Sequence, residues 1–201
     1  MRIDVERDPQ RMQAELDILY ERFFAPMGRP GLTAVDWNAP PHLRCYRRTA
    51  DGEHYVYVED ALRGRLAGCV VFNRLPRLDR RLDAHVRSPH SRFRPAYQRQ
   101  GLATLIYRHV LDAGICLVSG ARQSPAAHRL WQKLGQHYPL GYVRLDGRRV
   151  TPLPPQADGL DDLDTRLLLC GVGWDAHALA GLADARCARA AAPVAPPVAG
   201  S

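Results

Sequence analysis

Residues 93–111 constrain the fold most, because an extended lead-in, a glycine turn and an amphipathic helix follow one another there. One face of the helix is formed, at helical spacing, by Leu102, Leu105, Ile106 and His109. Gly101 lets the backbone approach a ligand closely. The first helical turn presents N–H groups without intrahelical acceptors, and Arg99 adds positive charge beside them. The stretch therefore predicts a strand, a turn and a helix whose start binds a phosphate or pyrophosphate.

The same residues carry a resemblance to a known family. Gln98-x-x-Gly101-x-Ala103 resembles the Q/R-x-x-G-x-G/A signature of the GNAT family of N-acetyltransferases, and Phe93-x-Pro95-x-Tyr97 is similar to its V-x-P-x-Y lead-in. In that family the turn holds the pyrophosphate of acetyl-CoA, and the preceding strand holds the pantetheine and thioester. The resemblance implies acetyl-CoA contacts at Phe93, Arg94, Gln98, Arg99, Gln100, Gly101, Leu102, Ala103, Thr104 and Ser124. The alternative is a turn before an ordinary surface helix.

A second segment is similar to the same family. Ser124-x-x-Ala127-x-x-x-Trp131-x-Lys133-Leu134-Gly135 resembles N-x-x-A-x-x-x-Y-x-K-x-G, with Ser in place of Asn and Trp in place of Tyr. The resemblance covers residues 43–145 and is firmest over 93–135. In many members the Tyr protonates the leaving CoA thiolate, whereas an indole N–H only donates a hydrogen bond.

The departure at Trp131 leaves several mechanisms open. Another residue is the acid, or water protonates the thiolate, or the chain has drifted from acetyl transfer. Tyr138 and His128 are the candidate acids. The family often places a carboxylate base before the signature, but residues 84–94 contain none, so His85 and His90 are the candidate bases. Backbone N–H groups at the end of the strand that closes with Phe93 would stabilise the oxyanion.

Length and composition favour one domain with an appendage. No run of about 18 apolar residues exists, and the charged N-terminal residues lack the apolar centre of a signal peptide, so we expect a cytoplasmic protein without a membrane span. We expect reduced cysteines and no metal, because no metal-ligand spacing appears among Cys45, Cys69, Cys116, Cys170 and Cys187.

The net charge is +7, and arginine supplies almost all of the positive charge, because Lys133 is the only lysine. This skew looks more like a coding bias than a nucleic-acid footprint, so nucleic-acid binding is not favoured. The charge would help to capture anionic CoA or an acidic partner such as a carrier protein.

Periodicity and turn signals predict the order of elements. We expect a helix over 8–24, strands over 43–49, 54–59 and 66–73, a loop to about Leu82, and a strand ending at Phe93. Pro89 cannot donate to a ladder, so that strand has a bulge, an edge or, as we favour, a break there. After the helix that follows Gly101 we expect a strand over 115–119, a helix over 124–134, a strand over 141–145, a linker over 152–159, a strand over 166–170 and a helix over 174–186.

These elements predict an α/β (α+β) fold like that of the GNAT family, with a mixed, mostly antiparallel sheet flanked by helices. We expect an acyl-CoA-binding domain over residues 1–145, a C-terminal extension packed on the core over 146–187, and a disordered Ala/Pro-rich tail over 188–201.

Three functions are consistent with this sequence. The leading one is an acetyl-CoA-dependent N-acetyltransferase acting on an amine of a small molecule or peptide. The second is the same fold with a longer acyl-CoA or an acyl carrier protein as donor, and the third is an inactive binding protein. The preserved glycine turn argues against the third, although fold alone decides none of them. The acceptor and the oligomeric state are not indicated by any pattern; a homodimer is one expectation.

Overall fold

The computed structural model describes residues 1–3, 8–25, 29 and 31–184 of the chain. The helices are α1 (Pro9–Phe23), α2 (Arg80–Asp83), α3 (Leu102–Asp112), α4 (Pro125–Leu134), α5 (Ala176–Asp184) and the 3₁₀ helix η1 (Pro95–Tyr97). The strands are β1 (Arg2–Ile3), β2 (Thr33–Val35), β3 (Leu43–Ala50), β4 (Glu53–Asp60), β5 (Arg65–Asn73), β6 (Val86–Phe93), β7 (Cys116–Val118), β8 (Arg122–Gln123), β9 (Leu140–Asp146), β10 (Arg149–Leu153) and β11 (Thr165–Leu169).

Nine strands form one sheet in the order β10-β9-β11-β7-β6-β5-β4-β3-β2. Every neighbouring pair is antiparallel except β6 and β7, which are parallel. The predicted mixed, mostly antiparallel sheet flanked by helices is therefore confirmed. β1 and β8 form a separate parallel pair of two residues each.

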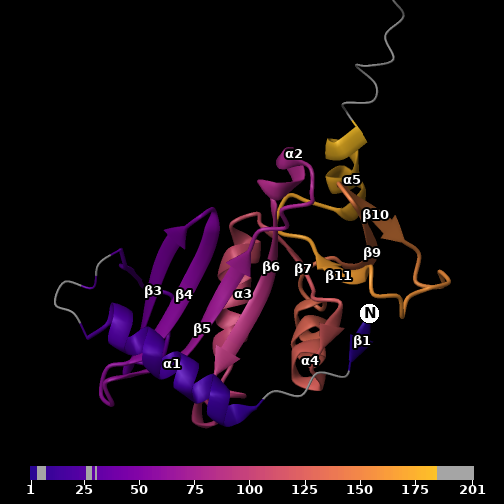
Figure 1. Ribbon diagram of the computed structural model, residues 1–201. Coiled ribbons are helices and arrows are strands. Elements are labelled where there is room, and N and C mark those ends of the chain that lie inside the picture. Colours follow the sequence, from indigo (N-terminus) through magenta and orange to yellow (C-terminus); the bar gives the residue numbers. More distant parts are fainter. Residues whose placement is uncertain (4–7, 26–28, 30, 185–201) are drawn as a thin grey trace, which may run out of the picture.

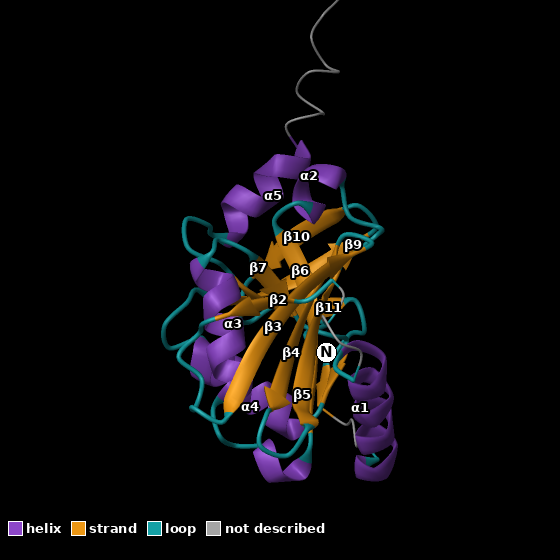
Figure 2. Ribbon diagram, turned by 90° about the vertical axis from the view of Figure 1, so that its left-hand side faces the viewer, coloured by secondary structure: helices purple, strands orange, loops and turns teal. Residues whose placement is uncertain are grey.

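Helices cover both faces of the sheet, α1 on one side and α3 and α4 on the other (Figures 1 and 2). On the α1 side, Leu16 and Phe23 pack on Tyr57 and Cys69. On the α3 side lies the main core, with buried residues from α3, α4 and strands of both halves of the sheet. α2 and α5 lie together beside β10 (Figure 1), over a third cluster that includes Leu82 and Leu179.

The predicted helix starts are confirmed where a capping residue precedes them. The Asp8 carboxylate accepts a hydrogen bond from Gln10 N at 2.9 Å, and the Ser124 hydroxyl accepts one from Ala127 N at 3.2 Å. Asp175 does the same for the last helix, with His177 N at 2.8 Å. α1 and α4 begin within one residue of the predicted start, whereas α5 begins at Ala176, two residues after the predicted start at Trp174.

The favoured break at Pro89 is wrong, because β6 is continuous and pairs with β5 without a register shift. Arg94 N donates to Ala67 O at 3.0 Å, and backbone groups alternate in direction along an antiparallel ladder. The backbone groups of Phe93, Ser91 and Pro89 therefore point away from β5. Proline therefore removes no ladder bond to β5. The alternative of an edge describes this site best, since β7 pairs only with Val86 and Arg87.

Short and edge elements account for the other differences. The loop expected up to Leu82 contains α2, and the expected linker begins inside β10, where Pro152 pairs with Val143 on the outer strand of the sheet. Proline is tolerated there because one side of an edge strand has no partner in the sheet. From the expected C-terminal extension, β11 lies within the sheet between β7 and β9. The expected tail over 188–201 and Cys187 lie outside the described residues.

No helix in the described ranges has both the length and the apolar character that a membrane span needs.

Candidate functional site

The site is organised by the divergence of two parallel strands. β6 and β7 pair only at Val86↔Cys116 and Arg87↔Leu117. After these pairs β6 remains hydrogen-bonded to β5 alone, whereas β7 pairs with β11. We call the edge of β6 over residues 88–93, which has no β7 partner in the described structure, the parted flank. α3 and α4 follow these two strands, so both helices begin at the carboxyl edge of the same strand pair. Two helix starts therefore flank the place where the strands separate.

Backbone groups of β6 point into the parted flank. The register that leaves position 89 without a backbone hydrogen bond to β5 also directs the N–H of Phe93 away from β5. The carbonyl of Phe93 points the same way and accepts a hydrogen bond from Gln98 Nε2 at 2.8 Å. An exposed strand edge of this kind can hydrogen-bond an extended ligand as a neighbouring strand would.

Phe93 takes its position because Gly68 lies opposite it on β5. A Cβ at Gly68 would meet the Phe93 ring and lie 2.5 Å from Arg92 O. The ring therefore occupies space that any other residue at position 68 would fill. Phe93 as a residue is 8% exposed and belongs to the main core. This explains how Phe stands where the family has Val.

Hydrogen bonds of Tyr97 and Gln100 fix the turn that follows β6. Tyr97, in η1, donates from its hydroxyl to Asp60 Oδ2 at 2.5 Å and accepts from Arg65 Nε at 3.1 Å. Burial would raise the pKa of Asp60, but the hydrogen bonds from Tyr97 and Arg63 outweigh it and lower the pKa to about 2. Gln100 Nε2 donates to Ala96 O at 2.7 Å and tightens the turn.

The start of α3 fits an anionic ligand. Gly101 has φ +81°, and a Cβ built on it would meet nothing within 4 Å, so the space beside the turn is open. Arg99, at φ +60°, is also left-handed and its side chain is exposed. The first intrahelical bond runs from Leu105 N to Gly101 O at 2.9 Å, so the N–H groups of residues 102–104 precede it. No side chain caps this helix, unlike α4.

The predicted acetyl-CoA residues other than Arg94 divide into three groups. Gln98, Arg99, Gln100, Gly101, Ala103 and Thr104 lie on the turn and the exposed or half-exposed start of α3. Phe93 and Leu102 turn their side chains into the core, so only their backbone faces the turn. The Ser124 hydroxyl caps α4 at the adjacent helix start. Each of these residues stays a prediction as a ligand contact.

Arg94 faces the opposite side of the sheet. Its guanidinium donates through Nε to Leu66 O at 2.8 Å and forms an ion pair with Asp17 of α1. The residue is 6% exposed. Arg94 therefore links α1 to the end of β6, and the structure does not bring its charge to the turn.

The structure places Tyr138 far from the turn. Its hydroxyl donates to Asp112 Oδ1 at 2.6 Å, and Asp112 is the last residue of α3. Burial and this hydrogen bond raise the pKa of Tyr138 above its ordinary value. At 1.5 Å per residue, the two ends of α3 are about 15 Å apart. The structure therefore does not bring Tyr138 together with Gly101.

The predicted histidines are dispersed. The ring of His85, before β6 begins, packs on that of Trp174 with centroids 4.6 Å apart, at the other end of the strand from the turn. His90 alternates with Ser91 and so faces the α1 side of the sheet. His128, near the start of α4, has a buried Nδ1 without a hydrogen-bond partner in the described residues, and its Nε2 lies 3.5 Å from Gln132 Nε2.

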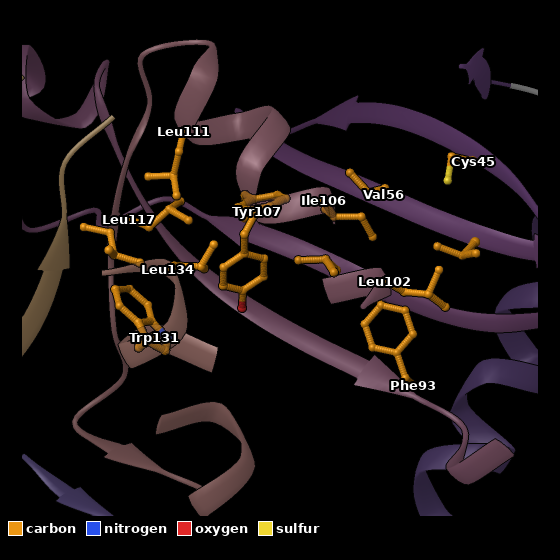
Figure 3. Packing of buried hydrophobic residues seen from close by; sticks show 14 of the residues in the cluster. Cys45, Val56, Phe93, Leu102, Ile106, Tyr107, Leu111, Leu117, Trp131 and Leu134 are labelled. Carbon is orange, nitrogen blue, oxygen red and sulfur yellow. The ribbon is translucent and has the colours of Figure 1, made fainter. Parts of the chain in front are cut away.

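One polar pair was not predicted. Tyr107 of α3 lies with its hydroxyl 2.9 Å from the Ser91 hydroxyl on the parted flank. Figure 3 shows the Tyr107 ring among the core residues, with its oxygen toward the strand that ends at Phe93. Trp131 of α4 is buried in the same cluster. The helical pattern could only assign Tyr107 to an apolar face, because its polar partner is 16 residues away in the chain.

Neither a metal-binding cluster nor an exposed thiol is found among the described residues. The described residues contain no group of three His, Cys, Asp or Glu side chains arranged to hold a metal. Cys45, Cys69, Cys116 and Cys170 are buried thiols, and burial raises the pKa of Cys45 to about 11. A thiol in this environment is a poor nucleophile.

Comparison with known proteins assigns the family. The family model described as the acetyltransferase (GNAT) family matches residues 16–136. No curated protein matches the sequence at a significant level.

Two solved structures that are similar to this chain are both acetyltransferases. A GNAT superfamily phosphinothricin acetyltransferase from Sinorhizobium meliloti, in complex with acetyl-CoA, is 15% identical, with 84% of this chain and 88% of its own chain covered and a TM-score of 0.38. A spermidine N-acetyltransferase mutant from Vibrio cholerae is 14% identical, with 79% and 89% covered and a TM-score of 0.35. Because the family model spans more than half of the 201 residues, the chain belongs to the GNAT family of acetyltransferases.

Proposed function

We propose that this chain transfers the acetyl group of acetyl-CoA to an amine of a small molecule or peptide by direct attack of the amine on the thioester. The observation that carries the proposal is the separation of β6 from β7 beside the start of α3. It provides a free strand edge for an extended pantetheine arm and a cluster of N–H donors for the pyrophosphate at one end of it. Family membership supports the same chemistry.

The chain's own groups would act on the reaction in two ways. The start of α3 and the exposed Arg99 would hold the anionic end of the donor, and binding there would position the thioester along the parted flank. The N–H of Phe93, which points away from β5, would donate to the carbonyl oxygen as negative charge develops. A backbone donor of this kind contributes about 3 kcal/mol to transition-state stabilisation.

The experiment is an incubation of the chain with acetyl-CoA and each of a panel of amines: polyamines, amino acids, aminoglycosides and peptides with a free N-terminus. Mass spectrometry would detect an acetylated amine, and calorimetry would measure acetyl-CoA binding independently. We expect binding, and acetylation of at least one class of amine.

Failure of a folded chain to bind acetyl-CoA would contradict the proposal. Tighter binding of a longer acyl-CoA, with transfer of that chain, would instead favour the alternative donor. A cytoplasmic location, an acidic carrier protein as partner and a homodimer stay predictions.

A further inference from the structure

Cleavage of the thioester requires a proton for the sulfur that leaves. When an amine attacks the thioester carbon and the carbon–sulfur bond breaks, the sulfur leaves as a thiolate and the nitrogen carries an extra proton. A donor within reach of the sulfur would complete the step. Trp131 has no acidic proton to give, so the donor must come from another residue or from water. This inference rests on the proposed function.

The structure presents a hydroxyl pair on the parted flank. Ser91 occupies a position of β6 beyond its last β7 partner, on the same face as Val70 opposite it and Phe93 two residues on. The Tyr107 hydroxyl lies 2.9 Å from Ser91 Oγ. The Tyr107 ring packs on Phe72 of β5 at 5.8 Å between centroids, and the residue is 3% exposed. The hydroxyl is thus held by packing, on the helix whose start would bind the pyrophosphate.

Position excludes the other tyrosines of the chain. The chain has eight, and all lie in the described residues. Four belong to the cluster on the α1 side of the sheet: Tyr20, Tyr46, Tyr55 and Tyr57. Tyr97 is bound to Asp60, and Tyr138 to Asp112 at the far end of α3. Tyr142 lies on β9, which β11 and β7 separate from β6.

We propose that Tyr107 is the catalytic proton donor to the departing sulfur, with Ser91 as the residue that orients its hydroxyl. The nitrogen–carbon bond forms, the carbon–sulfur bond breaks, and the proton of the Tyr107 hydroxyl passes to the sulfur. The proton lost by the amine nitrogen returns to the tyrosinate, directly or through the Ser91 hydroxyl. The products are the acetylated amine and CoA thiol, and Tyr107 ends the cycle unchanged.

The test uses CoA itself, which requires no knowledge of the acceptor. A hydroxyl that donates to the bound sulfur stabilises the thiolate and so lowers the pKa of the bound CoA thiol. Ultraviolet difference absorbance between the CoA and acetyl-CoA complexes, recorded against pH, would measure that pKa. We expect the pKa to be about one higher in Tyr107→Phe than in the wild type, a tenfold change in proton dissociation. With an amine accepted in the panel, kcat should fall about 100-fold.

Two controls separate this role from packing. Tyr107→Phe keeps the ring against Phe72, and calorimetry should give unchanged acetyl-CoA affinity. Tyr55→Phe removes a hydroxyl that donates to Glu53 Oε2 at 2.8 Å on the other face of the sheet, and should leave both the thiol pKa and kcat unchanged.

The outcomes separate this proposal from the proposed function. An unchanged thiol pKa in Tyr107→Phe, with CoA bound, would overturn the role of Tyr107 and leave the CoA site intact. A change in Tyr138→Phe or His128→Gln instead would assign the proton to that residue. Absence of CoA binding by the folded wild type would overturn the proposed function and this inference together.

Discussion

Phe93 and Gly68 are matched across β5 and β6. The aromatic ring fills the space above the glycine, and a methyl group at 68 would also press against the Arg92 carbonyl at 2.5 Å. We expect Gly68→Ala to lower the free energy of unfolding by about 1–3 kcal/mol, the usual cost of overpacking. Urea unfolding would measure it.

The partner substitution makes this prediction specific. In a Phe93→Val background, Gly68→Ala should lower the free energy of unfolding by less, because the ring is gone. Some loss should persist, because the new methyl group still meets the Arg92 carbonyl. Gly141→Ala is the matched control, since a Cβ at this other strand glycine would meet nothing within 4 Å. Equal costs of Gly68→Ala in both backgrounds would contradict the pairing.

Tyr97 and Asp60 couple the turn to pH. Because the pKa of Asp60 is depressed to about 2, its contribution is fully present above the ordinary pKa near 3.8 and is lost as pH falls towards 2. Tyr97→Phe removes one hydrogen bond to this carboxylate and should cost about 2 kcal/mol of unfolding free energy at neutral pH. In denaturant titrations, the difference from wild type should shrink between about pH 4 and pH 2. A difference that stays constant over that range would count against the coupling.

At this scale the sequence predicts residues whose local chemistry is distinctive. Gly101 and Ser124 follow from turn and capping preferences alone. The pairs Gly68–Phe93 and Ser91–Tyr107 depend on strand register and on which face of α3 meets β6. Those are long-range properties, which explains why neither pair could be predicted.

Among the elements, α4 depends most visibly on its cap. The Ser124 hydroxyl is the acceptor for Ala127 N, and Pro125 suits the first helical position. Ser124→Ala should lower the unfolding free energy by about 1 kcal/mol, whereas Ser124→Asn should stay close to the wild type, because Asn caps as well as Ser. Chemical denaturation of the three proteins would test this, and an equal loss in both variants would show that the cap is not the cause.

Capped helices and long alternating strands were therefore predictable, and short strands were not. β2, β8 and β10 have three, two and five residues, and each exists because of a partner elsewhere in the chain. A break at Pro89 and a linker from Pro152 were expected, yet both residues lie in strands. Pro89 occupies a position whose N–H would point away from β5, and Pro152 lies on the edge strand β10, where proline is tolerated. Whether a residue lies at an edge or in a hydrogen-bonded position depends on the sheet topology, which cannot be predicted from the neighbouring residues in the sequence.

In the whole molecule, two antiparallel halves of the sheet share one short parallel contact. β2 to β6 form one half and β7, β11, β9 and β10 the other, joined in the ladder by Val86↔Cys116 and Arg87↔Leu117. The main core spans the junction, with Val70 from one half and Leu117 and Leu167 from the other. A ligand held along the parted flank would therefore contact the junction of both halves and stabilise the native state as a whole.

The most direct test of the CoA site is thermal unfolding with and without acetyl-CoA in wild type, Gly101→Glu and Gly147→Glu. Both glycines are left-handed, at φ +81° and +53°, with open space where a side chain would go, but Gly147 lies in the β9–β10 turn at the far edge of the sheet. Both variants should lose about 1–2 kcal/mol from backbone strain. Only Gly101→Glu places a carboxylate where the pyrophosphate would bind.

At about 100 times its dissociation constant, acetyl-CoA should add about 2.7 kcal/mol to native stability and raise the midpoint by about 5–10 °C. We predict this rise in wild type and in Gly147→Glu, and its loss in Gly101→Glu. Equal rises in all three proteins, or no rise in a folded wild type, would contradict acetyl-CoA binding at the start of α3.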